Sequence, residues 1–167
     1  FIKKSGFLGV KLHPDYQGSF IDDEGYVRIL ECAKEYDLIV VTHSGVDCAF
    51  RGLPVKCTPE RVLNLMKKVT HKKLVLAHYG ANEMIDEVFD KLCGLDVYFD
   101  TAYVLRFMDK SIFEKILKKH GEDKILFATD SPWSDVQNDI NILNSFLENE
   151  TIKKKIFCEN AKKLLGI

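Results

Sequence analysis

The sequence has no long apolar run and almost no net charge. No stretch of its 167 residues approaches the roughly 18 consecutive apolar residues of a membrane span, and no signal-peptide pattern opens the chain. A net charge of -1 offers no excess of positive charge to a nucleic acid or a membrane surface. We therefore expect neither partner, and 46% hydrophobic residues predict an ordinary globular protein with a sizeable core.

The cysteines also lack a pattern. They are odd in number, and no two of them stand in CxxC spacing. Such a set favours reduced thiols in a cytoplasmic protein over a disulfide framework. The five are Cys32, Cys48, Cys57, Cys93 and Cys158.

What the chain does contain is a series of five apolar runs, each ending in a polar or ionisable residue. The ends stand at positions 13, 43, 78, 100 and 130, and their separations of 30, 35, 22 and 30 residues suit βα units. This alternation predicts an α/β fold with a parallel sheet covered by helices. The predicted strands are 7–13, 38–43, 74–78, 97–100 and 125–130.

Helix signals fall between these runs. N-cap residues and a Pro at the first helical position mark several helix starts. Segment 14–21 reads as a loop, and segment 44–58 is longer than a typical βα loop, which is common for functional loops. Four predicted helices start at Asp22, Thr58, Asn82 and Ser111. Two further helical segments are predicted over residues 135–147 and 150–165.

Side chains alternate between the two faces of a strand, so this pattern predicts which residues share a face. If the strands belong to a closed barrel, those faces point inward and the last residues converge at one mouth. The expected inward-facing pairs are Lys11 with His13, Val41 with His43, Leu76 with His78, and Ala128 with Asp130.

Three of these strand-end residues are candidates for a metal site. Imidazole and carboxylate groups such as those of His43, His78 and Asp130 bind Zn²⁺ and similar ions, and catalytic sites keep one position open for water. A bound metal lowers the pKa of that water to about 7, and a neighbouring histidine can move protons. The alternative is that each residue is a satisfied polar group at a strand end.

Several motifs, taken in order along nearly the whole chain, resemble the amidohydrolase superfamily, in particular its amidohydrolase-related (amidohydrolase 2) branch of metal-dependent hydrolases and decarboxylases. The resemblance implies strands 4 to 8 of a distorted (β/α)8 TIM barrel. The motifs are Gly9-Val-Lys-Leu-His-Pro14, Thr42-His-Ser-Gly45, Leu76-Ala-His-Tyr-Gly80, Ala128-Thr-Asp-Ser-Pro132 and Glu159-Asn-Ala-Lys-Lys-Leu-Leu-Gly166.

The same resemblance implies roles for the candidates. His43 matches a metal ligand on strand 5, and Asp130 matches a strand 8 aspartate that touches the metal or its water. His78 matches a catalytic acid/base or a second-metal ligand. The implied cofactor is a divalent metal ion, with Zn as the expected metal.

The family's His-x-His metal pair on strand 1 has no counterpart in this sequence. A lone fragment is therefore expected to bind metal poorly. The remaining histidines are His13, His71 and His120. His71 and His120 stand in polar connections, and we expect both to be solvated.

Three further residues are expected to contact substrate. Lys11 could pair with an anionic substrate or with Asp130, could be carboxylated to bridge two metals as in binuclear relatives, or could form a structural ion pair. His13 lies nearer the mouth and is favoured as a substrate contact. Trp133 follows Asp130 and is expected to wall the pocket, although an ordinary packed Trp is equally compatible with the sequence.

A (β/α)8 barrel needs roughly 250 residues, and the chain opens at Phe1 in what reads as the tail of a helix ended by Gly6. We expect residues 1–167 to be the C-terminal part of a single barrel domain, without its N-terminal βα units. The outer strands would then have free edges, and the piece alone would be inactive. We expect it to form a homo-oligomer or to rest on an N-terminal piece of the same protein. Inner residues expected to face water are Val41, Leu76, Leu126 and Ala128.

The leading functional hypothesis is a metal-dependent hydrolase that acts on a small organic substrate through metal-activated water. A decarboxylase or lyase of the same branch stays open, as does a non-catalytic fragment with a structural or binding role. A TatD-like nuclease is disfavoured because such enzymes carry a strand 4 glutamate where this chain has Lys11 and His13, and because the net charge is near zero.

Overall fold

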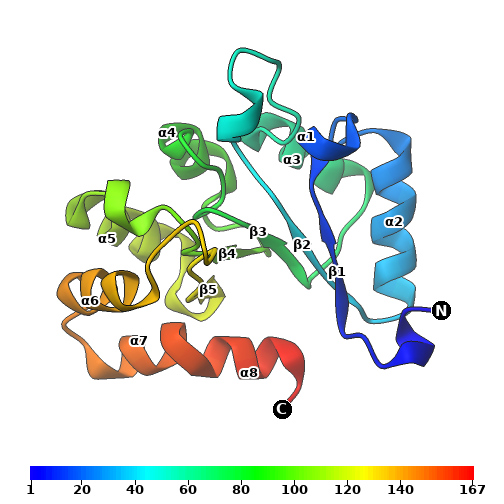
Figure 1. The fold of residues 1–167 in the computed structure, drawn as a ribbon. Coiled ribbons are helices and arrows are strands. Elements are labelled where there is room, and N and C mark those ends of the chain that lie inside the picture. Colours follow the sequence, from blue (N-terminus) through cyan, green and yellow to red (C-terminus); the bar gives the residue numbers. More distant parts are fainter.

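The computed structural model describes all residues 1–167 and contains one sheet of five parallel strands. The strands lie in the order in which they occur along the chain, as the sequence predicted (Figure 1). None of the helices combines the length and the apolar character that crossing a membrane requires. The strands are β1 (Gly9–Leu12), β2 (Ile39–Thr42), β3 (Leu74–Leu76), β4 (Tyr98–Asp100) and β5 (Ile125–Leu126).

The helices mostly lie between consecutive strands, as the βα spacing requires. Two segments, Val88–Leu92 and Lys155–Glu159, are π-helical continuations of the helices before them. The α-helices are α1 (Pro14–Gln17), α2 (Glu24–Glu35), α3 (Pro59–Lys68), α4 (Ile85–Glu87), α5 (Lys110–His120), α6 (Val136–Phe146), α7 (Glu150–Lys154) and α8 (Asn160–Leu165).

Two predicted helix starts are confirmed by side-chain caps. The Thr58 hydroxyl accepts a hydrogen bond from the backbone N–H of Arg61, with Pro59 at the first position of α3. The Asp135 carboxylate accepts from the N–H of Asn138 at the start of α6. Each cap satisfies a backbone donor that the first helical turn leaves free.

Other helix starts differ from the prediction because the polar side chain is used elsewhere. Asp22 binds Nη1 of Arg61 at 2.7 Å, and α2 begins one residue later, after Asp23. The Asn82 amide donates to the carbonyl oxygen of Val46, so α4 begins only at residue 85. Helix α5 begins at Lys110 rather than at the predicted cap, and the expected loop 14–21 opens with the short helix α1.

The last strand is shorter than the predicted segment 125–130. After Leu126 the chain leaves the ladder, and the N–H of Phe127 donates to the carbonyl oxygen of Ile156 instead. The Thr101 hydroxyl then makes hydrogen bonds of 2.9 and 3.0 Å with the backbone of Ala128. A bond to the helical segment Lys155–Glu159 and bonds to the Thr101 side chain thus hold residues 127–128 in place of strand pairing.

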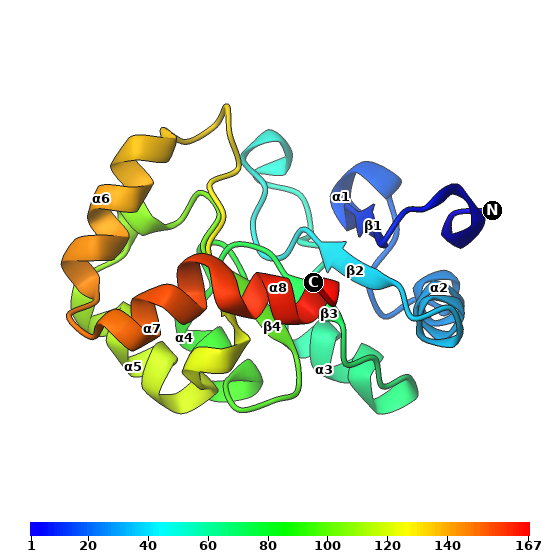
Figure 2. The same cartoon turned by 90° about the horizontal axis from the view of Figure 1, so that it is seen from below.

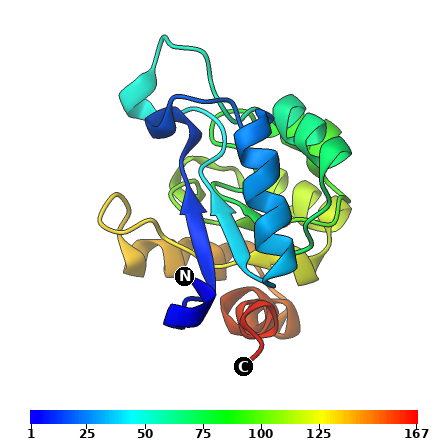
Figure 3. The same cartoon turned by 90° about the vertical axis from the view of Figure 1, so that its right-hand side faces the viewer.

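The two faces of the sheet are buried by different layers. Outer-face residues such as Leu76 and Phe99 join the main core with α2, α3 and α5. On the inner face, α8 lies across the lower part of the sheet (Figures 2 and 3), and its Leu164 packs against inner-face residues of the strands. This corrects the expected exposure: Leu126 is buried under α8 and Leu76 lies in the outer core, while the other two inner residues, Val41 and Ala128, are half-buried.

The prediction that His71 and His120 are solvated is wrong. Both are buried, and Nε2 of each donates to a backbone carbonyl, that of Leu38 and that of Val97. His120 also stacks on Phe99, with ring centroids 3.8 Å apart, and its Nδ1 accepts from the N–H of Gly94. These histidines have a structural role, because each gives a hydrogen bond to a backbone carbonyl group just before a strand.

Candidate functional site

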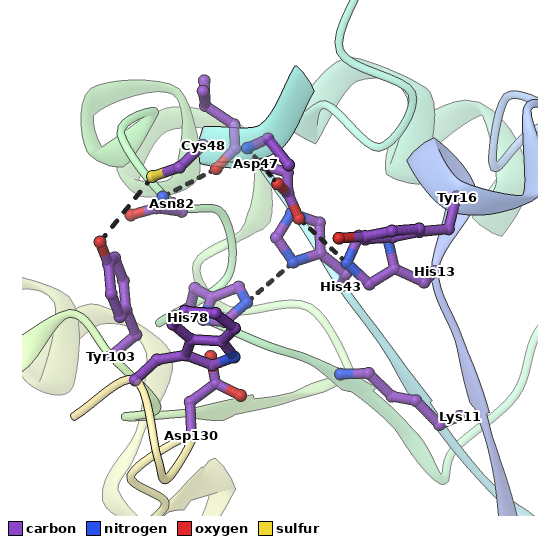
Figure 4. Close-up of a pocket in the computed structure, with 13 residues that line it drawn as sticks. Lys11, His13, Tyr16, His43, Asp47, Cys48, His78, Asn82, Tyr103 and Asp130 are labelled. Atoms are coloured by element: carbon purple, nitrogen blue, oxygen red, sulfur yellow. Dashed lines mark hydrogen bonds and ion pairs between the residues drawn. The ribbon is translucent and has the colours of Figure 1, made fainter. Parts of the chain in front are cut away.

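A pocket of about 540 Å³ opens at the carboxyl ends of the strands. Figure 4 shows the side chains that line it, which come from β1 and from the segments that follow each of the five strands. The rings of Tyr16 and Tyr103 contribute to its wall, and Asp47 and Cys48 come from the long loop 44–58. All six residues singled out in the sequence line this pocket: Lys11, His13, His43, His78, Asp130 and Trp133.

His78 reaches the pocket through a backbone turn rather than through strand alternation. Leu76, two residues earlier, is fully buried in the outer core, so the expected shared face of Leu76 and His78 is wrong. The φ angles of His78, Tyr79 and Gly80 are 63°, 55° and 97°, which makes three consecutive left-handed residues. Oδ1 of Asp100 accepts the backbone N–H of His78 at 2.9 Å and thereby holds this strained turn.

His43 and His78 form a hydrogen-bonded pair whose protons can be assigned from the network. Nδ1 of His78 lies 3.0 Å from the carbonyl oxygen of Ala102, which can only accept, so this nitrogen carries the proton. Nε2 of the neutral ring then accepts from Nδ1–H of His43 at 2.9 Å. Nε2 of His43 is left as an unprotonated lone pair, buried and without a partner.

Burial keeps the His43 ring neutral. Desolvation, with smaller contributions from the nearby His78, His13 and Lys11, lowers its pKa to about 3. Neutral imidazole with one free nitrogen is the form that binds a divalent metal, and the ring nitrogen opposite is usually fixed by a hydrogen bond. His43 therefore fits the role of a metal ligand on the chemistry of its own contacts.

A second histidine lies against the first. The rings of His13 and His43 are stacked, with centroids 4.2 Å apart and planes 8° from parallel. Nε2 of His13 lies 3.2 Å from Oδ2 of Asp47, and Nδ1 is buried without a partner. Burial lowers the pKa of His13, although Asp47 and Asp15 oppose that shift. One ligand atom from each of His13, His43 and Asp47 lies within 4.8 Å of the others.

The remaining candidates form the rim. Asp130, with φ of 60°, is exposed at the pocket wall and does not belong to the cluster of His13, His43 and Asp47. The side chain of Trp133 is 70% exposed, so it borders the opening rather than packing in the core. Lys11 is exposed on the inner face of β1, and its side chain extends into the same pocket (Figure 4).

Two residues of the site were not identified from the sequence. Asp47 lies in the loop 44–58, whose length was the only signal available. Asp100 ends a predicted strand in the same way as the chosen candidates, but its function is to hold the backbone of His78. No pattern in the sequence distinguishes that function from a carboxylate that faces the pocket.

With this geometry in view, the chain belongs to the amidohydrolase family. The family model Amidohydro_2, described as Amidohydrolase, matches residues 1–167. The comparison with curated proteins gives no match.

Solved structures show the same fold. A 2,6-dihydroxybenzoate decarboxylase from Rhizobium is 18% identical with a TM-score of 0.70, and covers 99% of this chain and 64% of its own. A dihydroxybenzoic acid decarboxylase from Polaromonas sp. JS666, with bound manganese and 2-nitroresorcinol, is 18% identical with a TM-score of 0.69. The match covers 99% of this chain and 62% of the decarboxylase. A structure named as a probable 2-pyrone-4,6-dicarboxylic acid hydrolase from Acinetobacter baumannii, with citric acid bound, is 14% identical with a TM-score of 0.71. The match covers 99% of this chain and 67% of that structure's chain.

These likenesses confirm the fold class predicted from the sequence. The five parallel strands form part of a TIM barrel of the amidohydrolase superfamily. The chain spans less than two thirds of the length of the two decarboxylases, 64% and 62%.

Proposed function

We propose that the chain is the C-terminal part of a metal-dependent hydrolase that acts on a small organic substrate. The observation that supports this most strongly is the unprotonated, buried Nε2 of His43, which lies in the pocket without a partner. A divalent ion held there, which we propose to be Zn²⁺, supplies a water whose pKa is lowered to about 7.

The residues of the chain then divide the remaining work. His43 binds the ion, and Asp130 contacts the ion or its water from the pocket wall. His78 is the proton carrier, since its Nε2 lies 2.9 Å from Nδ1 of His43 and its other nitrogen is fixed by Ala102. Lys11 holds an anionic group of the substrate.

Two more residues complete the proposed substrate site. His13, next to the His43 ring, contacts the substrate or the ion. Trp133, at the rim, shields the pocket from bulk water when substrate is bound, which strengthens the charge interactions inside.

A metal-dependent decarboxylase is the second candidate. The Lys11 ammonium and the rings of Tyr16 and Tyr103 line one pocket, and such a combination suits a planar, carboxylated ring. Several similar structures are named as decarboxylases of such acids. Release of CO₂ from a panel of aromatic carboxylates, compared with ester, amide and lactone hydrolysis, distinguishes the two reactions.

The partners follow from the incomplete barrel. Strands β1 and β5 each pair on one side only, so we propose that an N-terminal piece of the same protein or a second copy covers them. The substrate is a small molecule, and we propose neither a nucleic acid nor a membrane as a partner. The five cysteines, none of which is in a disulfide, support a cytoplasmic location.

The test uses the full chain in two variants. His43→Ala should lose the metal as measured by elemental analysis, and turnover with it. His78→Ala should cut turnover by roughly 100-fold or more while keeping the metal, because general acid–base catalysis contributes on this scale. If His78→Ala also loses the metal, His78 is a ligand and the proton-carrier role is wrong.

A further inference from the structure

Two imidazole nitrogens on stacked histidine rings are buried without a hydrogen-bond partner. They are Nε2 of His43 and Nδ1 of His13, and both are shielded from solvent. A buried polar atom without a hydrogen bond costs about 1–3 kcal/mol, so two of them on stacked rings need an explanation. The rest of the pocket does not supply one, because neither atom makes a hydrogen bond with the protein.

The contacts of the other nitrogen in each ring show whether the unpartnered nitrogen carries a proton. Nδ1 of His43 donates to His78, so Nε2 of His43 is a lone pair. Nε2 of His13 lies against the Asp47 carboxylate, which can only accept, so in the neutral ring Nδ1 of His13 is a lone pair as well. Two lone pairs cannot bond to each other. Only a cation or a donor can satisfy both.

The surroundings favour a cation. Metal-binding histidines usually donate their other ring N–H to a carboxylate or another acceptor, which fixes the tautomer. His43 does so to His78, and Nε2 of His13 lies 3.2 Å from Oδ2 of Asp47 as an ion-pair contact. The Asp47 carboxylate also places negative charge within 4.8 Å of the imidazole ligand atoms. Asp130, the ligand that the family resemblance implies, is outside this cluster.

We propose that His13 joins His43 as a ligand of the divalent ion and that Asp47 orients His13 beside it. This inference rests on the proposed function and adds to it a ligand that the chain itself provides. Asp130 keeps the contact with the ion or its water that the proposed function gives it. The chain would bind a divalent ion with its own residues, contrary to the poor binding expected from the lack of a His-x-His pair.

Binding requires a change in the stacked rings. The lone pairs lie in the ring planes, and with the planes 8° from parallel they point side by side rather than toward one point. The His13 side chain is 25% exposed and is held by a residue of the long loop 44–58, so it is the ring with room to turn.

The experiment measures Zn²⁺ affinity of the full chain by competition with a chromophoric chelator, and Co²⁺ absorption as a report of the ligands. His13→Ala should weaken Zn²⁺ binding by on the order of 100-fold and change the Co²⁺ spectrum, and Asp47→Asn should weaken it by about 10- to 100-fold. The control His71→Gln, whose ring lies outside the pocket, should stay within about threefold of the wild type.

The outcomes distinguish failure of the proposed function from failure of the His13 ligand assignment. If the wild type binds no Zn²⁺, the proposed function and this inference both fail, and an ordered water satisfies the two nitrogens. If the wild type binds Zn²⁺ and His13→Ala binds it equally well, only the ligand assignment is overturned. Melting curves of the metal-free variants check folding, and if His13→Ala does not fold, Asp47→Asn decides.

Discussion

The carboxylate of Asp100 holds the backbone of His78: Oδ1 accepts the N–H of His78 at 2.9 Å and that of Ala102 at 3.1 Å. Asp100 is itself buried, and burial raises its pKa, while His78 and Lys11 oppose that shift. The side chain that positions the proposed proton carrier therefore lies on β4, although the carrier follows β3.

Replacement of Asp100 tests this positioning role. Asp100→Ala should lower kcat by about 10- to 100-fold with little change in KM, because the left-handed turn at His78 loses its anchor while the rim of the pocket is unchanged. Asp100→Asn keeps an acceptor oxygen and should restore most of the loss. Equal defects in the two variants would show that the charge, rather than the hydrogen bond, matters.

Gly45 permits a close approach between two site loops. Its φ is 86°, and a Cβ atom built there would lie 2.2 Å from the backbone nitrogen of Asn82. Gly45→Ala should lower the free energy of unfolding by on the order of 3 kcal/mol, since both strain and backbone overlap oppose it. Urea denaturation measures the loss.

Gly52 is the matched control in the same loop. It also has a left-handed φ, 84°, but a Cβ atom there would meet nothing within 4 Å. Gly52→Ala should cost only about 1–2 kcal/mol, the strain of the left-handed conformation alone. If the two substitutions cost the same, the contact between Gly45 and Asn82 does not contribute to stability.

His120 makes stability depend on pH. Burial lowers its pKa from 6.5 to about 4, and protonation would put a hydrogen on Nδ1 against the N–H of Gly94. The unfolded chain binds more protons than the folded chain between these values, so stability is present above pH 6.5 and is lost as the pH falls toward 4. The full loss is about 3 kcal/mol.

The variant His120→Gln checks this pH dependence. Glutamine can donate and accept but does not titrate, so its unfolding free energy should change less with pH between 6.5 and 4 than that of the wild type. The remaining slope includes contributions from His71, His43 and His13, whose pKa values are also lowered by burial. Parallel pH profiles for variant and wild type would contradict the assignment to His120.

The open edges of the sheet predict association. Strands β1 and β5 border an apolar groove of about 450 Å³ together with α8, and each has one unpaired side. Sedimentation of the 167-residue chain should show dimers or larger species unless an N-terminal piece is supplied. A stable monomer at micromolar concentration would mean that α8 covers enough of the inner face by itself.

The sequence alone determined the order and type of the strands and which residues gather at their ends. Apolar runs that close on His13, His43, His78 and Asp130 recur at the spacing of βα units, and parallel strands place those ends at one edge. That inference needs only local hydrophobicity and chain length, so it held without knowledge of any contact.

Contacts between distant segments decided the rest. The sequence assigned His78 to the face of Leu76, but a left-handed turn held by Asp100 rotates it into the pocket. It left Asp47 unnoticed, because only folding brings the loop 44–58 against His13. Strand alternation is a property of the local backbone, whereas the direction of a lone pair depends on partners that lie tens of residues away, and only the tertiary structure supplies them.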